Sequence, residues 1–517
     1  MSGDATTVAA VLRHQACARG GHLLLVCDTE RLGYRDAEHR SARLARHLVA
    51  MGVGKGSHVG VLYPNGARFV VAALAAARIG AVVVPFPTMA TTAELRTLLV
   101  DSDVEILLTA ASYRSRDYVR ELSVVLGGSP RNGDPVFSAA APQLRRVLVD
   151  ADGAAACDSG ALDALEDDVD GADVLAIVYT SGSTGTPKGA IHTHAAILSH
   201  QRNLNAIRGL TASDRLFCNS PFFWIGGFAF ALLATLTAGA TLICSNATDA
   251  ADTLDLIEAE RPTVTNGFTA GIAHLTRHPT FGARDFSSLR RGNLYPIMAP
   301  DTRPADPALR HNMLGLTEAG SVVLLSDDEG DQPEHRRGSF GRPAPGFDVR
   351  IVDPVTDAPT PTGTVGELCL RGPYLMQRYH RRSREECFDA DGWFHTGDLV
   401  RADPDGYLYF VGRRDAMIKT AGANVAAAEV ESALARVTGG AAHVLGLPDT
   451  ERGQVVAAVV VLDDGATFDE AAVRERLRTE LSPYKVPRRF AVLRRGEVPL
   501  RSSGKVDTAA LKKVFDV

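Results

Sequence analysis

The sequence of 517 residues has few of the features that mark secreted, zinc-bound or nucleic-acid-binding proteins. Its seven cysteines are scattered and none forms a C-x-x-C pair, which argues against a disulfide frame or structural zinc and favours a reducing cytoplasm. The N-terminus lacks the cationic lead and apolar core of a signal peptide, so secretion is not expected. The net charge is only -6 and no long lysine or arginine run occurs, so nothing favours binding to nucleic acid or anionic membranes.

Charged residues are also absent from the stretch 216–248. An uncharged run of this length passes the threshold for a membrane-spanning helix. Pro221, Gly226, Gly227 and Gly239 interrupt it, however, and such breaks would loosen a helix in lipid. The run therefore predicts buried core and no membrane span.

The rest of the composition is that of a globular protein, with 45% hydrophobic and 22% charged residues. A chain of this length exceeds what one hydrophobic core serves, so several folding units are expected. From His58 to Leu108, short β-rich runs alternate with helical stretches, which predicts a parallel sheet covered by helices. The apolar run VLAIVYT at 174–180 predicts one more strand, buried on both faces.

The pattern changes after residue 336. Short alternating segments with Pro and Gly, running to about Phe410, predict a small antiparallel barrel or sheet. After Asp415 the order helix, strand, strand, helix, strand predicts a compact α+β unit.

The strongest local motif is YTSGSTGTPKG at 179–189, where the strand at 174–180 opens into a loop. Its glycines let backbone N–H groups crowd round phosphate oxygens, its hydroxyls add donors, and Lys188 adds a positive charge. The spacing is not that of a Walker loop, because Pro187 and Gly189 stand where glycine and Ser or Thr are needed. A flexible Ser/Gly linker is the alternative, but a linker requires neither a buried strand nor a Pro-Lys pair.

This loop resembles the phosphate loop of the acyl-CoA synthetases, firefly luciferases and peptide-synthetase adenylation domains, the ANL superfamily of adenylating enzymes. Four further matches follow in the family's order: GLTEAG at 315–320, GWFHTGDL at 392–399, GRRDAMIKTAG at 412–422 and PLRSSGK at 499–505. The resemblance implies an α/β multidomain fold. Two parallel-sheet subdomains and an antiparallel β subdomain, at about 334–410, form an N-terminal adenylation domain over 1–414, and a mobile C-terminal α+β domain covers 415–517.

The resemblance also implies the ATP site. Glu318 corresponds to a magnesium ligand, Thr317 to a donor to the α-phosphate, and Lys505 to the lysine that bridges the acyl carboxylate and the α-phosphate. Asp398 corresponds to the acid that accepts both ribose hydroxyls, with Arg413 as its companion. The other nucleotide-binding positions that it implies are Thr180, Ser181, Gly182, Ser183, Thr184, Gly185, Thr186, Lys188, Leu314 and Gly315.

Asp415 corresponds to the hinge of the family, about which the C-terminal domain turns after adenylation. Lys419 and Gly422 would then lie on the face that accepts the thiol. The implied cofactors are ATP, Mg²⁺ and coenzyme A.

Two apolar segments, at 221–230 and 265–271, resemble the walls of the family's acyl pocket. Neither contains the aspartate that amino-acid-activating relatives use, so an acid without an α-amino group is favoured. Glycines beside Trp224 and Phe228 leave room for a ring, although these aromatics could equally pack the core. The pocket residues implied are Trp224, Gly226, Gly227, Phe228, Asn266, Gly267, Met298 and Ala299.

Three positions depart from the family. Leu314 replaces an adenine-stacking tyrosine, Trp224 replaces a common histidine, and YPIMAP at 295–300 replaces a glycine-rich turn. The segment that follows, 301–312, is too short and proline-broken for the family's helix. His192 and His194 form an H-x-H, for which a structural role is favoured over a metal site because no third ligand is evident.

These observations predict a cytoplasmic acid–thiol ligase: an acid and ATP give acyl-AMP and pyrophosphate, and coenzyme A then gives the thioester and AMP. One alternative is an adenylating enzyme of specialised metabolism that uses another acceptor, namely a carrier-protein thiol, an amine or nitrite. A second is a non-catalytic nucleotide-binding homologue. Neither nucleic acid nor a membrane span is expected among its partners.

Overall fold

The computed structural model describes residues 5–151, 159–180, 187–414, 418–425, 427–462, 466–499 and 506–515. The chain divides into two compact units. The first comprises Met1–Thr88, Leu99–Tyr179 and Gly189–Val411, and the second comprises Met89–Leu98, Thr180–Lys188 and Gly412–Val517. The domain boundary predicted at residue 415 lies outside the described residues.

Two six-stranded sheets form the centre of the first unit. The first sheet is parallel except at one edge, where β2 runs antiparallel to β1. Its strand order is β14 (Arg291–Gly292), β13 (Val264–Asn266), β11 (Arg215–Cys218), β12 (Thr241–Cys244), β1 (Leu23–Cys27) and β2 (Glu30–Gly33).

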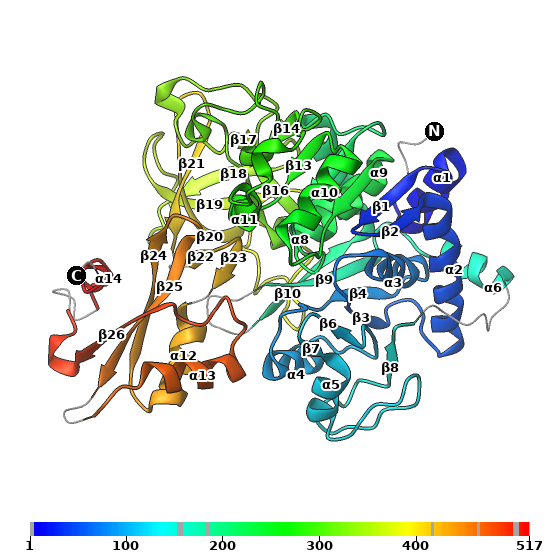
Figure 1. Ribbon diagram of the computed structural model, residues 1–517, viewed down its shortest axis with the longest axis horizontal. Helices are drawn as coiled ribbons and strands as arrows, with labels where there is room; N and C mark the ends of the chain where they lie inside the picture. The colour runs from blue at the N-terminus through cyan, green and yellow to red at the C-terminus, as the bar shows by residue number, and fades with distance from the viewer. Residues whose placement is uncertain are drawn as a thin grey trace. The chain divides into compact units, whose positions relative to one another are not determined.

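The second sheet contains the strands predicted from the alternating pattern after His58. Its order is β10 (Lys188–Thr193), β9 (Val174–Thr180), β4 (Val82–Pro85), β3 (His58–Leu62), β5 (Ile106–Thr109) and β8 (Arg146–Val149). Between β3 and β4 the chain forms α3 (Ala67–Arg78), which packs on both strands. Figure 1 shows α3 beside these strands and next to α2 (Tyr34–Ala50), which in turn contacts α1 (Val8–Arg19). The predicted parallel sheet with its helical cover is therefore confirmed.

The remaining helices of this unit are short or lie between strands. They include α5 (Tyr118–Leu126), α6 (Ser159–Asp167), α7 (His194–Ile207), α10 (Ala250–Glu260) and α11 (Ala273–Thr276). α4 (Thr92–Asp101) runs from one unit into the other.

The uncharged stretch is folded into the core. It contains β11, the short helix α8 (Ile225–Gly227), a π-helical turn η1 (Phe228–Leu233), α9 (Ala234–Ala238) and β12. All six residues of η1 are buried. Among the described residues, no helix has the length and apolar character needed to cross a membrane.

The antiparallel sheet predicted after residue 336 is present, and a second antiparallel sheet, which was not predicted, lies mostly before that residue. One is β15 (Leu314–Leu316), β16 (Ser321–Leu325) and β17 (Arg342–Pro343), and the other is β18 (Asp348–Val352), β19 (Gly366–Arg371), β20 (Phe394–Ala402) and β21 (Leu408–Arg413). They share one core, which contains Val323, Phe347, Leu368 and Val400. That core also includes Phe230 from η1, so the uncharged stretch and the antiparallel sheets are packed together.

The second unit contains the predicted order of helix, strand, strand, helix and strand. These are α12 (Ala427–Thr438), β24 (Ala442–Asp449), β25 (Gly453–Leu462), α13 (Glu470–Glu480) and β26 (Arg489–Arg494). A hairpin of β22 (Ile418–Thr420) and β23 (Ala423–Val425) precedes them, and α14 (Thr508–Lys513) follows. β22 pairs with β25 in the same sheet.

Candidate active site

Thr317 and Glu318 lie in a short 3-10 turn, η6 (Thr317–Ala319), between β15 and β16. The hydroxyl of the buried Tyr379 donates a hydrogen bond of 2.7 Å to Oε1 of Glu318. The backbone of Glu318 is held as well, because the N–H of Met376 donates to the Glu318 carbonyl at 2.7 Å. Glu318 is thus held by its backbone and by one carboxylate oxygen. An oriented carboxylate of this kind suits a Mg²⁺ ion, which takes one or two protein carboxylates together with phosphate oxygens.

The backbone of Thr317 is held by His192, which is fully buried near the end of β10. Its Nε2 lies 2.7 Å from the carbonyl oxygen of Thr317. Burial lowers the pKa of His192 to about 4, so the neutral ring donates Nε2–H to this carbonyl. His194, by contrast, accepts a hydrogen bond from the N–H of Val8 through Nδ1. The two histidines of the H-x-H therefore contact different parts of the protein.

Helix α7 ties the same turn to β16. Gln201 donates to the carbonyl of Gly320 at 3.2 Å, and the ring of His200 lies 2.9 Å from the carbonyl of Val322. Burial lowers the pKa of His200 to about 4 as well, so its Nε2 carries the proton. Buried neutral histidines thus fix the backbone on both sides of Glu318.

Asp398, the predicted ribose ligand, lies within β20 and is 2% exposed. Its N–H donates to Oγ1 of Thr396, which in turn donates to the carbonyl of Leu368. The N–H of Gly397 donates to the buried Glu367 carboxylate at 2.9 Å. The T-G-D segment is therefore held against β19 through Thr396 and Gly397.

Aromatic rings form the wall of the predicted acyl pocket. Trp224 is partly exposed, and its ring meets Phe268 edge to face at 5.8 Å between centroids. Phe223 also meets Trp224 edge to face, at 5.4 Å between centroids. Phe228, in contrast, is 1% exposed and packs against Phe69 of α3.

The two neighbouring glycines of this wall differ in their surroundings. A Cβ added to Gly227 would overlap the carbonyl oxygen of Pro221, so only glycine fits there. At Gly226 the nearest atom to an added Cβ is Oγ of Ser220, at 3.8 Å. Of this pair, Gly226 alone has room beside it.

Three asparagines that sequence reasoning missed hold this wall. Asn219 both donates to the carbonyl and accepts from the N–H of Phe268, each at 2.9 Å. Asn293 donates to the carbonyl of Gly267 at 2.7 Å and accepts from its N–H at 3.1 Å. Asn65 bonds Ser220 and Phe222, at 3.0 and 2.7 Å. The signal available in the sequence was weak: Asn219 directly follows the apolar strand β11.

The remodelled segment after β14 matches its prediction. Met298 and Ala299 are buried, and they follow a single 3-10 turn, η4 (Tyr295–Ile297). Between residues 301 and 312 the only regular element is the 3-10 turn η5 (Pro307–Leu309), so the family's longer helix is absent from this described segment. Leu314 is 3% exposed and lies in the same core as Phe347.

Gly315 lies in β15, and Asn266 ends β13. The remaining predicted residues belong to the second unit or lie outside the described ranges. Thr180 ends β9, Lys188 begins β10 and Arg413 ends β21. Lys419 lies in β22, and Gly422, with φ +82°, lies in the tight turn to β23. Ser181, Gly182, Ser183, Thr184, Gly185, Thr186, Asp415 and Lys505 lie outside the described residues, so their roles stay predictions.

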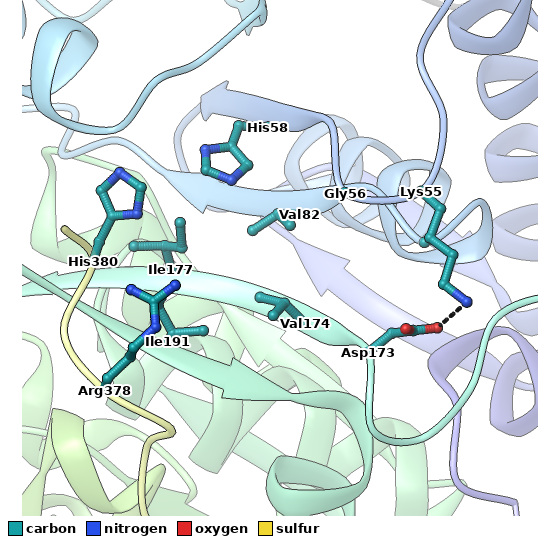
Figure 2. A pocket seen from close by; sticks show the side chains of 11 residues that line it. Lys55, Gly56, His58, Val82, Asp173, Val174, Ile177, Ile191, Arg378 and His380 are labelled. Atoms are coloured by element: carbon teal, nitrogen blue, oxygen red, sulfur yellow. Dashed lines mark ion pairs between the residues drawn. The ribbon is translucent and has the colours of Figure 1, made fainter. Parts of the chain in front are cut away.

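Two further groups of polar side chains lie away from these positions. Figure 2 shows a cavity of about 290 Å³ into which His58, His380 and Arg378 point, with the Lys55–Asp173 ion pair at its other end. None of the predicted site residues lines this cavity.

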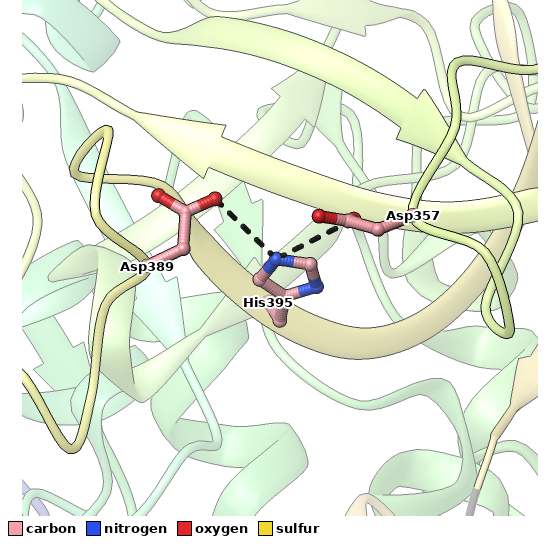
Figure 3. A group of neighbouring side chains, drawn as sticks. All are labelled: Asp357, Asp389 and His395. Carbon is pink, nitrogen blue, oxygen red and sulfur yellow. Dashed lines mark ion pairs between the residues drawn. The ribbon is translucent and has the colours of Figure 1, made fainter.

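Figure 3 shows the second group, in which His395 Nε2 lies 3.8 Å from Asp357 and 3.7 Å from Asp389. The guanidinium of Arg350 already pairs with Asp389 at 2.7 Å and lies 3.6 Å from Asp357. We interpret this group as an ion-pair cluster.

Comparison with known proteins identifies the family. A model described as AMP-binding enzyme matches residues 12–380, and one described as AMP-binding enzyme C-terminal domain matches residues 429–505. The chain belongs to the AMP-binding enzyme family. It is an AMP-forming acyl-CoA synthetase of the ANL superfamily, a ligase that joins small carboxylic acids to coenzyme A with ATP.

Several members of the AMP-binding enzyme family resemble this chain along nearly its whole length. A feruloyl-CoA synthase from Amycolatopsis sp is 33% identical, over 94% of each chain. The 3-[(3aS,4S,7aS)-7a-methyl-1,5-dioxo-octahydro-1H-inden-4-yl]propanoyl:CoA ligase of Mycobacterium tuberculosis is also 33% identical, over 99% of this chain and all (100%) of its own. Among solved structures, the amide bond synthetase McbA from Marinactinospora thermotolerans has a TM-score of 0.80 at 24% identity and covers 98% of this chain and 99% of its own. This last likeness shows the fold alone.

Proposed function

We propose that the acid which this ligase activates is aromatic or otherwise carries a ring, and that it lacks an α-amino group. The observation that carries the proposal is the wall formed by Trp224, Phe268 and Phe223, beside Gly226, where an added Cβ would meet no atom closer than 3.8 Å. The wall segments 221–230 and 265–271 contain no acidic residue. An ammonium group would lose its hydration there without gaining a carboxylate partner. The relative named a feruloyl-CoA synthase supports an aromatic acid.

We infer that Glu318 binds the Mg²⁺ that accompanies ATP. One of its oxygens accepts the hydrogen bond from Tyr379, and this bond orients the carboxylate. The ion, when bound, neutralises phosphate charge and so lets the anionic acid approach. Thr317, held by His192, is proposed to donate to the α-phosphate, and Asp398 to bind the ribose with Arg413.

The phosphate loop at 180–188, Leu314 and Gly315 complete the proposed nucleotide site. Lys505 is proposed to bridge the acyl carboxylate and the α-phosphate during displacement of pyrophosphate. Asp415 is proposed as the hinge between the domains 1–414 and 415–517. Lys419 and Gly422 would form the face that receives the thiol.

Pyrophosphate release with MgATP tests this proposal. Aliphatic, aromatic and polycyclic acids are compared with and without coenzyme A, and products are identified by mass. We expect acyl-AMP from ring-bearing acids, and acyl-CoA when the thiol is added. Acyl-AMP that ignores coenzyme A but reacts with a carrier-protein thiol, an amine or nitrite would assign a different acceptor. Equal rates with amino acids would refute the proposed pocket.

Two variants test the division of labour between the half-reactions. Lys505→Ala should lose adenylation while keeping thioester formation from supplied acyl-AMP, because the lysine acts only in the first step. Asp415→Pro should do the reverse, since proline restricts the rotation of a hinge. Equal loss of both steps in Lys505→Ala would contradict its assignment. A cytoplasmic location, proposed from the scattered cysteines, is tested by fractionation of cells that produce the protein.

A further inference from the structure

Arg208 is a cationic side chain close to the acyl wall for which the proposed adenylation chemistry has no use. It follows α7, and its guanidinium carbon lies 4.0 Å from the centroid of the Phe230 ring. Its Nη2 donates to Oδ1 of Asn205 and to the carbonyl oxygen of Phe230, both at 3.0 Å. Its Nε is buried and finds no hydrogen-bond partner among the described residues. The donor capacity of this guanidinium is therefore only partly used.

The charge of Arg208 also lacks a direct counter-ion. Within the described part of the chain, no carboxylate forms an ion pair with it. The nearby Asp214 is engaged elsewhere: it accepts from Arg291 at 2.9 Å and from Thr263 at 2.8 Å. Burial lowers the pKa of Arg208 to about 9, and the group is still charged at neutral pH. Arg208 is half-buried, and a partly desolvated cation without a carboxylate partner is suited to bind an acceptor oxygen of a ligand.

Arg208 contacts the wall segment 221–230 through Phe230. Phe230, over which it stacks, belongs to the segment that contains Trp224 and Gly226. The buried Cys218 lies near enough to interact with the charge of Arg208, and Nδ2 of Asn266 lies 4.0 Å from the sulfur of Cys218.

The helical geometry at the contact between Arg208 and Phe230 is unusual. Phe230 and its carbonyl lie in the π-helical turn η1, a rare form that is found frequently at functional sites. Arg208 donates to that carbonyl, so it contacts the turn through both the ring and the backbone of one residue.

We propose that Arg208 determines specificity: it hydrogen-bonds an acceptor oxygen at the end of the acid remote from the reacting carboxylate. This inference rests on the proposed function and narrows the substrate to ring-bearing acids with a distal carboxylate, ketone or hydroxyl oxygen. The guanidinium has five N–H donors in a fixed fork, and those not bonded to Asn205 and Phe230 can serve such an oxygen. Trp224, Phe268 and Gly226 bound the apolar part of the same acid.

Matched acids and matched variants test this proposal. The acids are phenylpropanoic acid with and without a hydroxyl or carboxylate at the far ring position, and cyclohexanepropanoic acid with and without a ring ketone there. The variants are Arg208→Met, which keeps an unbranched chain over Phe230 but removes the charge, and the control Arg120→Met, at an exposed position on α5. Each is assayed for kcat/KM in pyrophosphate release and, without ATP, for the rise in unfolding temperature that each acid causes.

Wild type and Arg120→Met should favour at least one acid with the distal oxygen over its parent by about 10- to 100-fold, the range for a charge-assisted hydrogen bond. Arg208→Met should lose that preference and keep its activity on the parent acid. An equal loss on both members of a pair would assign Arg208 to folding alone and overturn the proposal, as would a wild type without any preference. If Arg208→Met does not fold, Arg208→Lys replaces it, because lysine lacks the fork of N–H donors and should weaken the preference for the distal oxygen. The absence of that preference in the wild type would overturn the proposal whether or not a variant folds.

The two readouts separate this inference from the function on which it rests. A thermal preference without any pyrophosphate release would refute the proposed adenylation while supporting Arg208. Pyrophosphate release without a preference for acids with a distal oxygen would support the proposed adenylation and overturn the role of Arg208.

Discussion

Replacing Tyr379 by phenylalanine removes the hydroxyl that orients Glu318 and leaves the ring in place. The hydrogen bond measures 2.7 Å, its acceptor is a carboxylate, and its donor is 8% exposed. A charge-assisted hydrogen bond of this kind is worth about 1.5 to 3 kcal/mol, which is about a 10- to 100-fold change in an equilibrium constant. The loss of a group that orients a metal ligand has a similar effect on metal affinity.

The assay is pyrophosphate release at saturating acid and fixed ATP, titrated with Mg²⁺. We expect Tyr379→Phe to require about 10- to 100-fold more free Mg²⁺ for half-maximal rate. Tyr409→Phe is the matched control, because the hydroxyl of this buried tyrosine also donates to a carboxylate, that of Asp403, at 3.0 Å. An unchanged Mg²⁺ requirement in Tyr379→Phe, or the same shift in both variants, would refute the role assigned to Glu318.

Two more predictions concern stability and the pocket. Burial lowers the pKa of His192, His194 and His200 to about 4, below the ordinary 6.5, so the unfolded chain binds more protons between these values. The contribution of these histidines to the free energy of unfolding should be greatest above about pH 6.5, and it should fall toward pH 4 by up to about 3 kcal/mol per histidine. Urea unfolding across this range measures the loss, which His200→Gln should reduce; a flat profile would contradict it. Gly227→Ala should lower the unfolding temperature because its Cβ overlaps Pro221. Gly226→Ala should leave the unfolding temperature nearly unchanged and raise KM for bulky acids. A larger loss of stability in Gly226→Ala than in Gly227→Ala would show that we have misassigned which glycine has room beside it.

The parts of the fold that local patterns predicted are those in which runs of apolar residues are long enough to identify a helix or a strand. The strands around His58 and the helix over 67–78 follow from the alternation of short β-rich apolar runs with helical stretches, and the C-terminal α+β order follows from the same signal. The first sheet was predicted only through the family resemblance, as one of two parallel-sheet subdomains, and local patterns did not locate its strands. Its strands β13 and β14 have three and two residues, too few for a period to appear.

The sequence could name candidate site residues where a motif carries chemistry, but it could not name the residues that hold them in place. Glu318 and Asp398 lie in motifs of fixed order, so sequence reasoning could name them. Tyr379 contacts Glu318 from 61 residues away, and Asn219 contacts Phe268 from 49 residues away. A contact between residues so far apart depends on how the sheets are folded together, and a single sequence carries no signal for it.

The asparagines that hold the acyl wall separate its shape from its lining. Asn65, Asn219 and Asn293 bind backbone atoms, which every residue type supplies. Side chains such as Trp224 and Phe268 can therefore be exchanged while the loops that carry them keep their course. A ligase built in this way can acquire a new acid by substitution at a few lining positions, and an engineer who wishes to redirect it should leave the three amides untouched and vary the rings.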